Sequence, residues 1–447
     1  MYLPADAEKL ISLLLSAGYK AYAVGGCVRD SILGKPMSDV DICTSALPEE
    51  TERLLEENSV RFVETGLKHG TVTAVINHTP YEITTFRTDG EYLDNRRPES
   101  VSFVTDVKED LSRRDFTVNA LAYNKEEGIV DFFGGVEDIK NRVIRAVGNP
   151  DTRFNEDALR IMRALRFSSV LGFEIESETE TAIFRNKELL LNIANERIYT
   201  ELIKLLLGDN CENVLLKYRE IIAVILPEIK PCFDFPQNNK WHIYDVYTHI
   251  VKTCAAAPKT DYIRLAAFLH DIGKPECKTT DKNGSDHFYR HPIVGAELAK
   301  GALKRLRVSN KVMNKTLSLI RYHDCNFSEK PAGIKKQLRK FGGELTFELI
   351  ELKTADLKAH NPALAEPEIE ALAEVKRKAQ TIIDNKEPYR ISDLKINGSD
   401  LKEIGFEGKE INTELERLIQ LVSGSPEHNE KEKLLQIAQK EYKRLKK

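Results

Sequence analysis

Two aspartates one residue apart, Asp39 and Asp41, have a spacing that suggests metal chemistry. They lie in a short apolar segment predicted to be a strand, so both carboxylates should project from one face, with Val40 turned into the core. Hard oxygen ligands suit Mg²⁺, and paired magnesium ions are a common device for phosphoryl or nucleotidyl transfer. A solvated edge strand would show the same spacing, so the residues alone leave both interpretations open.

Phosphate-binding candidates precede and follow this pair. Gly25 and Gly26 lack side chains, so backbone amides there can approach a triphosphate closely, with Arg29 nearby as a counter-charge. A tight turn without a ligand explains a Gly-Gly pair equally well. Glu82, on a strand predicted over 81–86, is a candidate third catalytic carboxylate, although a solvated sheet residue is at least as good an explanation.

A mixed polar cluster follows in the segment RRDFTVN, which contains Arg114, Asp115 and Asn119. Guanidinium, carboxylate and amide groups together can hold phosphates and ribose hydroxyls. The same cluster could equally be a set of surface salt bridges that caps a helix.

Asp157 and Arg160 are three residues apart in a helix predicted over 156–171, which places them on one helix face. A carboxylate accepts hydrogen bonds, whereas a guanidinium only donates them. Cytosine and adenine each present an amino donor beside a ring-nitrogen acceptor, while guanine and uracil present a carbonyl beside an N–H. One Asp/Arg pair could therefore accept C and A and reject G and U, although an ion pair on a solvated helix is the commoner meaning of this spacing.

A separate set of metal-ligating residues lies downstream. It comprises His249, the doublet His270–Asp271, His291 and the doublet His323–Asp324. Imidazoles with an adjacent His-Asp doublet can bind one or two divalent ions and leave a position open for water, which a metal-dependent phosphohydrolase requires. A lone helical histidine is usually structural, so only the whole set carries this interpretation.

The elements that must position these residues change character along the chain. A helix is predicted over 5–17 and strands over 70–76 and 81–86, which favours an α/β head with a short mixed sheet. The polar stretch 87–100 is predicted to be a mobile loop over a site. From about residue 154 helical periodicity dominates to the end of the chain.

The composition indicates a multidomain globular protein. The 447 residues predict two to four domains. With 66 basic and 70 acidic residues the net charge is −4, so a nucleic-acid partner must meet a local basic patch. Seven scattered cysteines without a CxxC pair indicate reduced thiols, and no apolar run approaches the roughly 18 residues of a membrane span. We therefore expect a cytoplasmic protein with no membrane partner.

The motifs together resemble a known family. The segments GGCVRDSILG with DVD, TTFRTDGEYLDNRRPESVSF, DLSRRDFTVNALAYN, RFNEDALRIMRALRF and ANERIYTEL occur in this order. They resemble the bacterial and eukaryotic class of tRNA nucleotidyltransferases, the CCA-adding enzymes, and the related bacterial poly(A) polymerases. The resemblance implies a polymerase-β-like head, a helical neck that recognises the base, a helical body and an RNA-binding helical tail, over residues 1–145, 146–215, 216–365 and 366–447.

The resemblance also implies roles for these residues. Asp39 and Asp41 would hold Mg²⁺ for attack of a tRNA 3′-hydroxyl on CTP or ATP, and the base would be read within EDALR by Asp157 and Arg160. The nucleotide would be bound by Gly25, Gly26, Arg29, Arg114, Asp115, Asn119, Asp157, Arg160 and Arg163.

The histidine set looks like the HD phosphohydrolase superfamily, whose pattern is H…HD…D. Asp324 is the leading candidate to close this pattern, with His291 and His323 as auxiliary ligands of a divalent transition metal. The C-terminal segments are similar to the family's tRNA-binding tail. Four basic side chains are candidates for the same tRNA surface, although a solvated helix face is the commoner meaning of such a cluster: Lys335, Lys336, Arg339 and Lys340.

Several functions remain open from the sequence. The chain could add all of CCA or only the terminal A, because one pocket accepts both bases. The family ties the motif over 86–103 to addition of the terminal A, which disfavours addition of CC alone. A bacterial poly(A) polymerase, and an HD phosphohydrolase with a regulatory nucleotide-binding head, are the alternatives. The oligomeric state does not follow from the sequence.

Overall fold

The structure is a computed structural model that describes residues 3–37, 39–66, 70–90 and 101–446. The chain divides into two compact units, Met1–Pro227 and Glu228–Lys447, and each is described by itself.

The first unit is built on a seven-stranded mixed sheet. Its strand order is β3-β4-β5-β2-β1-β8-β9, in which β2 and β5 are parallel and the other neighbours are antiparallel. The strands are β1 (Ala21–Val24), β2 (Asp41–Thr44), β3 (Arg61–Gly66), β4 (Thr71–Ile76), β5 (Thr79–Thr85), β8 (Leu121–Asn124) and β9 (Gly128–Asp131). This arrangement confirms the predicted α/β head with a mixed sheet.

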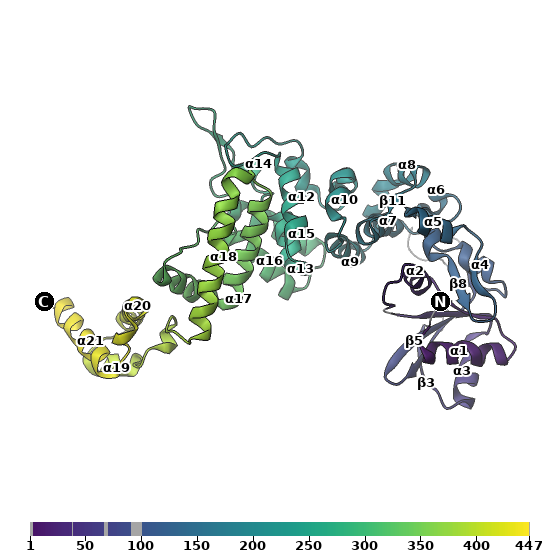
Figure 1. Ribbon diagram of the computed structural model, residues 1–447, viewed down its shortest axis with the longest axis horizontal. Coiled ribbons are helices and arrows are strands. Elements are labelled where there is room, and N and C mark those ends of the chain that lie inside the picture. Colours follow the sequence, from purple (N-terminus) through teal and green to yellow (C-terminus); the bar gives the residue numbers. More distant parts are fainter. Residues whose placement is uncertain (1–2, 38, 67–69, 91–100, 447) are drawn as a thin grey trace. The chain divides into compact units, whose positions relative to one another are not determined.

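Helices cover both faces of the sheet centre, since every residue of β1 is buried. On one side α1 (Ala5–Ser16) and α3 (Pro48–Glu57) contact the strands and each other (Figure 1). On the other, Tyr22 and Phe86 pack in one core cluster with Leu111 of α4 (Val107–Ser112). The apolar core therefore fixes the position of β1 and β2.

The start of β2 differs from the prediction. The strand begins at Asp41, whereas Asp39 lies in the irregular segment before it. Val40 is buried, as expected from the alternation. Two short strands, β6 (Arg87–Asp89) and β7 (Val101–Phe103), pair at the ends of the predicted mobile loop, of which residues 91–100 lie outside the described residues.

Helices dominate the rest of the first unit. The predicted helix over 156–171 is interrupted, because α6 (Pro150–Glu156) ends before Asp157 and α7 (Leu159–Leu171) begins after Ala158. The other helices are α2 (Gly26–Ile32), α5 (Gly135–Asn141), α8 (Ser177–Asn186), α9 (Asn195–Leu206), α10 (Cys211–Lys217) and α11 (Arg219–Ile225). A small parallel pair, β10 (Val143–Ile144) and β11 (Glu174–Ile175), lies among them.

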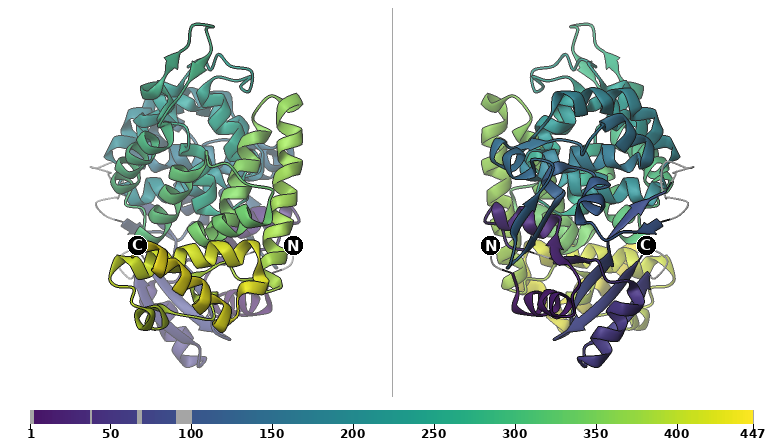
Figure 2. Two further views of the ribbon diagram at one scale, coloured as in Figure 1. Left: turned by 90° about the vertical axis from the view of Figure 1, so that its left-hand side faces the viewer. Right: turned by 90° about the vertical axis from the view of Figure 1, so that its right-hand side faces the viewer.

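The second unit is mostly helical. Its helices are α12 (Val246–Ala256), α13 (Asp261–Leu269), α14 (Lys274–Cys277), α15 (His291–Arg305), α16 (Asn310–Tyr322), α17 (Pro331–Lys358), α18 (Pro362–Asp384), α19 (Gly398–Ile404), α20 (Lys409–Gly424) and α21 (Lys431–Leu445). A hairpin of β12 (Thr279–Thr280) and β13 (Asp286–His287) is an exception to the expected all-helical body, and it projects beside α14 (Figures 1 and 2). Helix α18 runs through the expected body–tail boundary at 365/366.

The predictions about the cysteines and about membrane-spanning segments can be compared with the structure. All seven cysteines are free thiols, five of them buried and two half-buried. Among the described residues no helix is both long and apolar enough to cross a membrane.

Lys335 is buried, which removes it from the expected basic surface on α17. Its ammonium donates to the backbone carbonyl of Ser423 at 3.0 Å and lies 2.9 Å from the Glu387 carboxylate. Lys335 therefore connects α17 to the end of α20. Buried side chains of α20 pack with those of α19 and α21 in one apolar core.

We expect Lys335→Ala to lower the free energy of unfolding of the second unit by about 1–3 kcal/mol, because a buried carbonyl loses its donor. Lys336→Ala, at the neighbouring exposed position, should change it by less than about 0.5 kcal/mol. Urea denaturation of the two variants measures the difference. Equal losses of stability would show that the Lys335 contacts do not stabilise the unit.

Candidate functional site

Three carboxylates, those of Asp39, Asp41 and Glu82, lie close together at the start of β2. Because Ile42 of β2 is opposite Ile83 of β5, Asp41 and Glu82 lie side by side on the same face of the sheet. Desolvation raises the pKa of Asp41, and the negative charges of Glu82 and Asp39 raise it further, while Arg114 lowers it. Mutual repulsion of this kind is relieved by a divalent cation, so the donor set fits Mg²⁺.

Gly25 permits the close approach of an arginine at the start of α2. Its φ of +80° disfavours any residue with a side chain, and a Cβ there would lie 3.0 Å from Nη1 of Arg114. Arg114 is held by the fully buried carboxylate of Asp110, which also binds Arg113. Sequence reasoning missed Asp110, although it lies three residues before the Arg-Arg pair, one helical turn away.

Buried hydrogen bonds connect the remaining head residues to the neck helix α7. Arg29 donates to the Asn119 side chain, and Asn119 donates to Oδ1 of Asp115 at 3.1 Å. Oδ2 of Asp115 accepts from Nε of Arg163 at 2.7 Å. Burial alone would raise the pKa of Asp115, but the Arg163 charge and the Asn119 hydrogen bond hold it at about 2. This carboxylate is therefore ionised at neutral pH.

Asp157 and Arg160 do not share the face of a continuous helix, so that expectation is wrong. Asp157 lies in the break between α6 and α7, where its Oδ2 accepts from Nη2 of Arg197 at 2.8 Å. Arg160 instead pairs with Glu156 at 2.7 Å and donates to the Arg113 carbonyl at 2.8 Å. Each base-reading candidate is therefore held by a different partner. Arg197 was not selected from the sequence, although the segment ANERIYTEL contains it.

One cavity of about 420 Å³ is lined by all nine of the expected nucleotide-binding residues. Its positive charge is concentrated around Phe167, whose ring centroid lies 4.0 Å from the Arg166 guanidinium and 5.2 Å from that of Arg29. Crowded guanidiniums of this kind suit the negative charge of a triphosphate. The lining residues are Gly25, Gly26, Arg29, Asp41, Arg113, Arg114, Asp115, Asn119, Asp157, Arg160, Arg163, Arg166, Phe167 and Arg197.

A second polar centre lies in the second unit. His249 on α12 and His270 at the end of α13 face each other with their Nε2 atoms 3.3 Å apart. His291 on α15 and His323 at the end of α16 do the same at 3.1 Å. Asp271 lies between the two pairs, with Oδ2 3.1 Å from His270 and Oδ1 3.2 Å from His291.

The tautomers of these four histidines fit a metal site. Each Nδ1 lies within 3.3 Å of a backbone carbonyl, to which it must donate its hydrogen. In its neutral form each ring would therefore direct the lone pair of Nε2 at its neighbour. Two ion–nitrogen bonds of about 2.0–2.1 Å at a tetrahedral angle place the nitrogens about 3.3–3.4 Å apart, close to both distances. Asp271 would offer one carboxylate oxygen to each histidine pair.

The geometry favours Asp356 over Asp324 as the carboxylate that closes the pattern. Asp356 on α17 is buried, and its Oδ1 lies 3.0 Å from Nε2 of His249. The side chain of Asp324 is 62% exposed and pairs with Lys353 at 3.6 Å. Asp324 was predicted to close the pattern because it belongs to the His323–Asp324 doublet. Nothing in the sequence around Asp356 distinguishes it from other helical acids.

Comparison with protein families matches both units. Residues 21–145 match the poly A polymerase head domain, residues 172–233 the probable RNA and SrmB-binding site of polymerase A, and residues 242–359 the HD domain. The CCA-adding enzyme of Ligilactobacillus salivarius is 47% identical over 52% of this chain and 59% of its own length. That of Lactiplantibacillus plantarum is 53% identical over 46% of this chain and 51% of its own length. The chain thus spans about half the length of the curated relatives it matches.

Solved structures extend the match over the whole chain. The Bacillus stearothermophilus CCA-adding enzyme in complex with CTP is 30% identical, with a TM-score of 0.72 over 100% of this chain and 99% of that one. The Thermotoga maritima CCA-adding enzyme complexed with tRNA shares the fold at 20% identity and a TM-score of 0.59, over 98% of this chain and 95% of that one. Head fold and helical units together define a nucleotidyltransferase. The chain belongs to the CCA-adding enzyme family.

The assignment of Asp356 predicts a difference in metal content. We expect Asp356→Asn to retain about one equivalent less transition metal than the unaltered protein after desalting, because the first histidine pair loses its charged ligand. Asp324→Asn should retain the full amount. Inductively coupled plasma mass spectrometry measures both, and equal retention by the two variants would contradict the assignment.

Proposed function

We propose that this chain adds nucleotides to the 3′ end of tRNA, using CTP and ATP to build CCA and releasing pyrophosphate. The observation that carries this proposal is the single cavity in which Asp41, the arginines of the head and the pair Asp157 and Arg160 meet. The full-length match to a CCA-adding enzyme in complex with CTP supports it.

The chemistry follows from the charges in this cavity. Mg²⁺ held by Asp39 and Asp41 would activate the tRNA 3′-hydroxyl and offset charge on the phosphates. Glu82 keeps the local field negative beside them. Arg29, Arg114 and further cavity arginines bind the triphosphate and stabilise the charge that develops on the leaving pyrophosphate.

Base choice follows from the two side chains at the break between α6 and α7. The Asp157 carboxylate accepts from the exocyclic amino group of C or A, while Arg160 donates to the ring nitrogen. Guanine and uracil would place a carbonyl against the carboxylate, which leaves two acceptors facing each other. Glu156 and Arg197 hold the readers in position, so the side chains replace a nucleic-acid template.

We expect the double variant Asp39→Ala, Asp41→Ala to lose at least 10³-fold in nucleotide incorporation, because the ligands of the catalytic ion are removed. Glu57→Ala, at an exposed position at the end of α3, should retain normal activity. Incorporation of labelled CTP into tRNA that lacks CCA measures both. Near-normal incorporation by the double variant would end the proposal.

A second activity is favoured by the histidine and aspartate centre. We propose that the HD domain hydrolyses phosphate esters, since two bridged divalent ions with an open position can supply a hydroxide at neutral pH. A cavity of about 870 Å³ leads to the centre, and the cations that line it can bind the phosphate: Lys240, Lys274, Arg290 and Lys353. The alternative is a structural metal site.

Hydrolysis of 2′,3′-cyclic AMP separates these two roles. We expect turnover by the metal-loaded protein and at least a 10²-fold loss in Asp271→Asn, which removes the bridging carboxylate. The double variant Asp39→Ala, Asp41→Ala serves as the control and should hydrolyse the substrate normally. A metal-loaded protein without turnover would reduce the centre to a structural role.

A further inference from the structure

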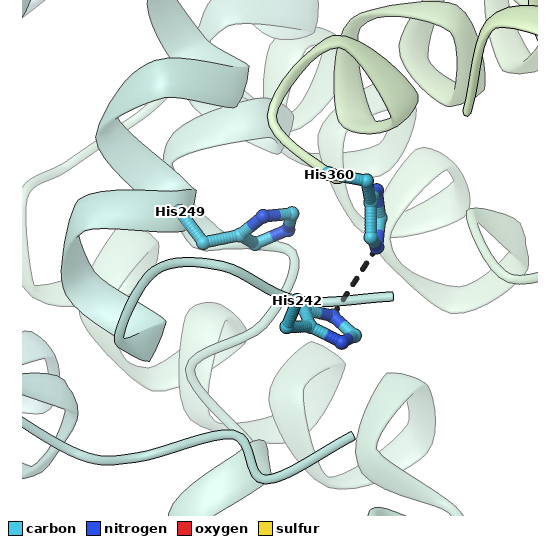
Figure 3. A group of neighbouring side chains, drawn as sticks. All are labelled: His242, His249 and His360. Carbon is cyan, nitrogen blue, oxygen red and sulfur yellow. Dashed lines mark hydrogen bonds between the residues drawn. The ribbon is translucent and has the colours of Figure 1, made fainter. Parts of the chain in front are cut away.

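A third pair of facing imidazoles lies beside the HD centre. His242 precedes α12 and His360 follows α17, and their Nε2 atoms are 3.2 Å apart (Figure 3). The ligand atoms of His242, His249 and His360 all lie within 4.8 Å of one another. Figure 3 shows the three rings converging from separate segments of the second unit. The HD pattern includes His249 but neither His242 nor His360.

The tautomer of His242 is fixed by an asparagine. Oδ1 of Asn239 accepts from the backbone N–H of Trp241 at 3.0 Å, which identifies it as the oxygen of the amide. Nδ1 of His242 lies 2.8 Å from the same oxygen and must therefore donate to it. The Nε2 atom of neutral His242 consequently carries a lone pair.

The tautomer of His360 is fixed by the backbone. Its Nδ1 lies 2.9 Å from the carbonyl oxygen of Asp356, one helical turn earlier, so this nitrogen carries the hydrogen. Nε2 of His360 is then also a bare acceptor. Among the described residues, Nε2 of His242 is the polar atom within hydrogen-bonding distance of it. Two acceptors that face each other repel, whereas a cation between them is bound by both.

The distance between these acceptors fits a shared ion. A tetrahedral ion with nitrogen bonds of about 2.0–2.1 Å separates its ligands by about 3.3–3.4 Å. The Nε2–Nε2 distance in the third pair is 3.2 Å, and the corresponding distances in the two pairs of the HD centre are 3.1 and 3.3 Å.

Lys274 is the group that competes with a cation here. Its ammonium lies 3.1 Å from Nε2 of His242, 2.7 Å from Oε1 of Gln237 and 2.6 Å from Oδ2 of Asp271. An ion on His242 displaces the first of these contacts and leaves the other two, including the ion pair. His360 has no such competitor among the described residues.

We propose that His242 and His360 hold a further divalent transition-metal ion, separate from the two ions of the HD centre. His249 remains a ligand of the first HD ion, because its Nε2 lies 3.0 Å from Asp356 and 3.3 Å from Asp271. The third ion keeps open positions toward the same cavity, which His242 and His360 line. Imidazole pairs favour ions such as Zn²⁺ and Co²⁺ over Mg²⁺.

Metal counting on the full chain tests this site without any reaction. Chelator-treated protein is loaded with Co²⁺, desalted and analysed for bound cobalt, and its absorption spectrum is recorded. We expect the double variant His242→Gln, His360→Gln to bind one equivalent less than the unaltered protein, with loss of one component of the cobalt spectrum. His287→Gln is the matched control, because His287 lines the same cavity but pairs with Asp281 on the hairpin.

Two results would overturn the proposal. One is an unchanged cobalt content in the double variant, which would mean that the pair binds no ion. The other is a loss of every HD-bound ion by a variant whose thermal unfolding matches the unaltered protein, which would mean that the pair only shapes the main centre. The single variants His242→Gln and His360→Gln repeat the count if the double variant fails to fold.

Discussion

The buried carboxylate of Asp115 is the interaction on which the nucleotide cavity depends. It accepts from Asn119 of the head and from Arg163 of α7, so one ionised group joins the sheet-based part of the first unit to its helices. Removing one partner of a buried ion pair costs about 3–5 kcal/mol, because the remaining charge loses its compensation. The same contact positions α7, and with it the break at which Asp157 and Arg160 lie.

The two units offer two different kinds of candidate metal ligands. The head offers carboxylates at the start of β2, where hard oxygen ligands and their mutual repulsion favour Mg²⁺. The HD centre offers imidazoles whose Nδ1 atoms lie at hydrogen-bonding distance from backbone carbonyls. The Nε2 atoms are therefore the ones directed at the centre, and imidazole ligands favour transition metals. The two ligand types would therefore favour different ions in the two units.

Local patterns in the sequence predicted the elements, whereas contacts between distant residues had to come from the structure. Alternation of apolar residues predicted strands over 70–76 and 81–86, which correspond to β4 and β5, and helical spacing predicted α1. The break at Asp157 was missed because the periodicity continues through it. Asp356 was missed because it lies 85 positions after Asp271 and becomes a neighbour only when α17 packs against α12.

The proposed function is tested most directly with three tRNA substrates, which end before the first C, before the second C and before the terminal A. Purified protein receives each of them with CTP and ATP offered separately, and the extension is read on a sequencing gel. Proposed CCA addition predicts growth by C on the first two substrates and by A on the third. Growth on the last substrate alone would show addition of the terminal A only, and no growth on any of them would contradict nucleotidyl transfer to tRNA.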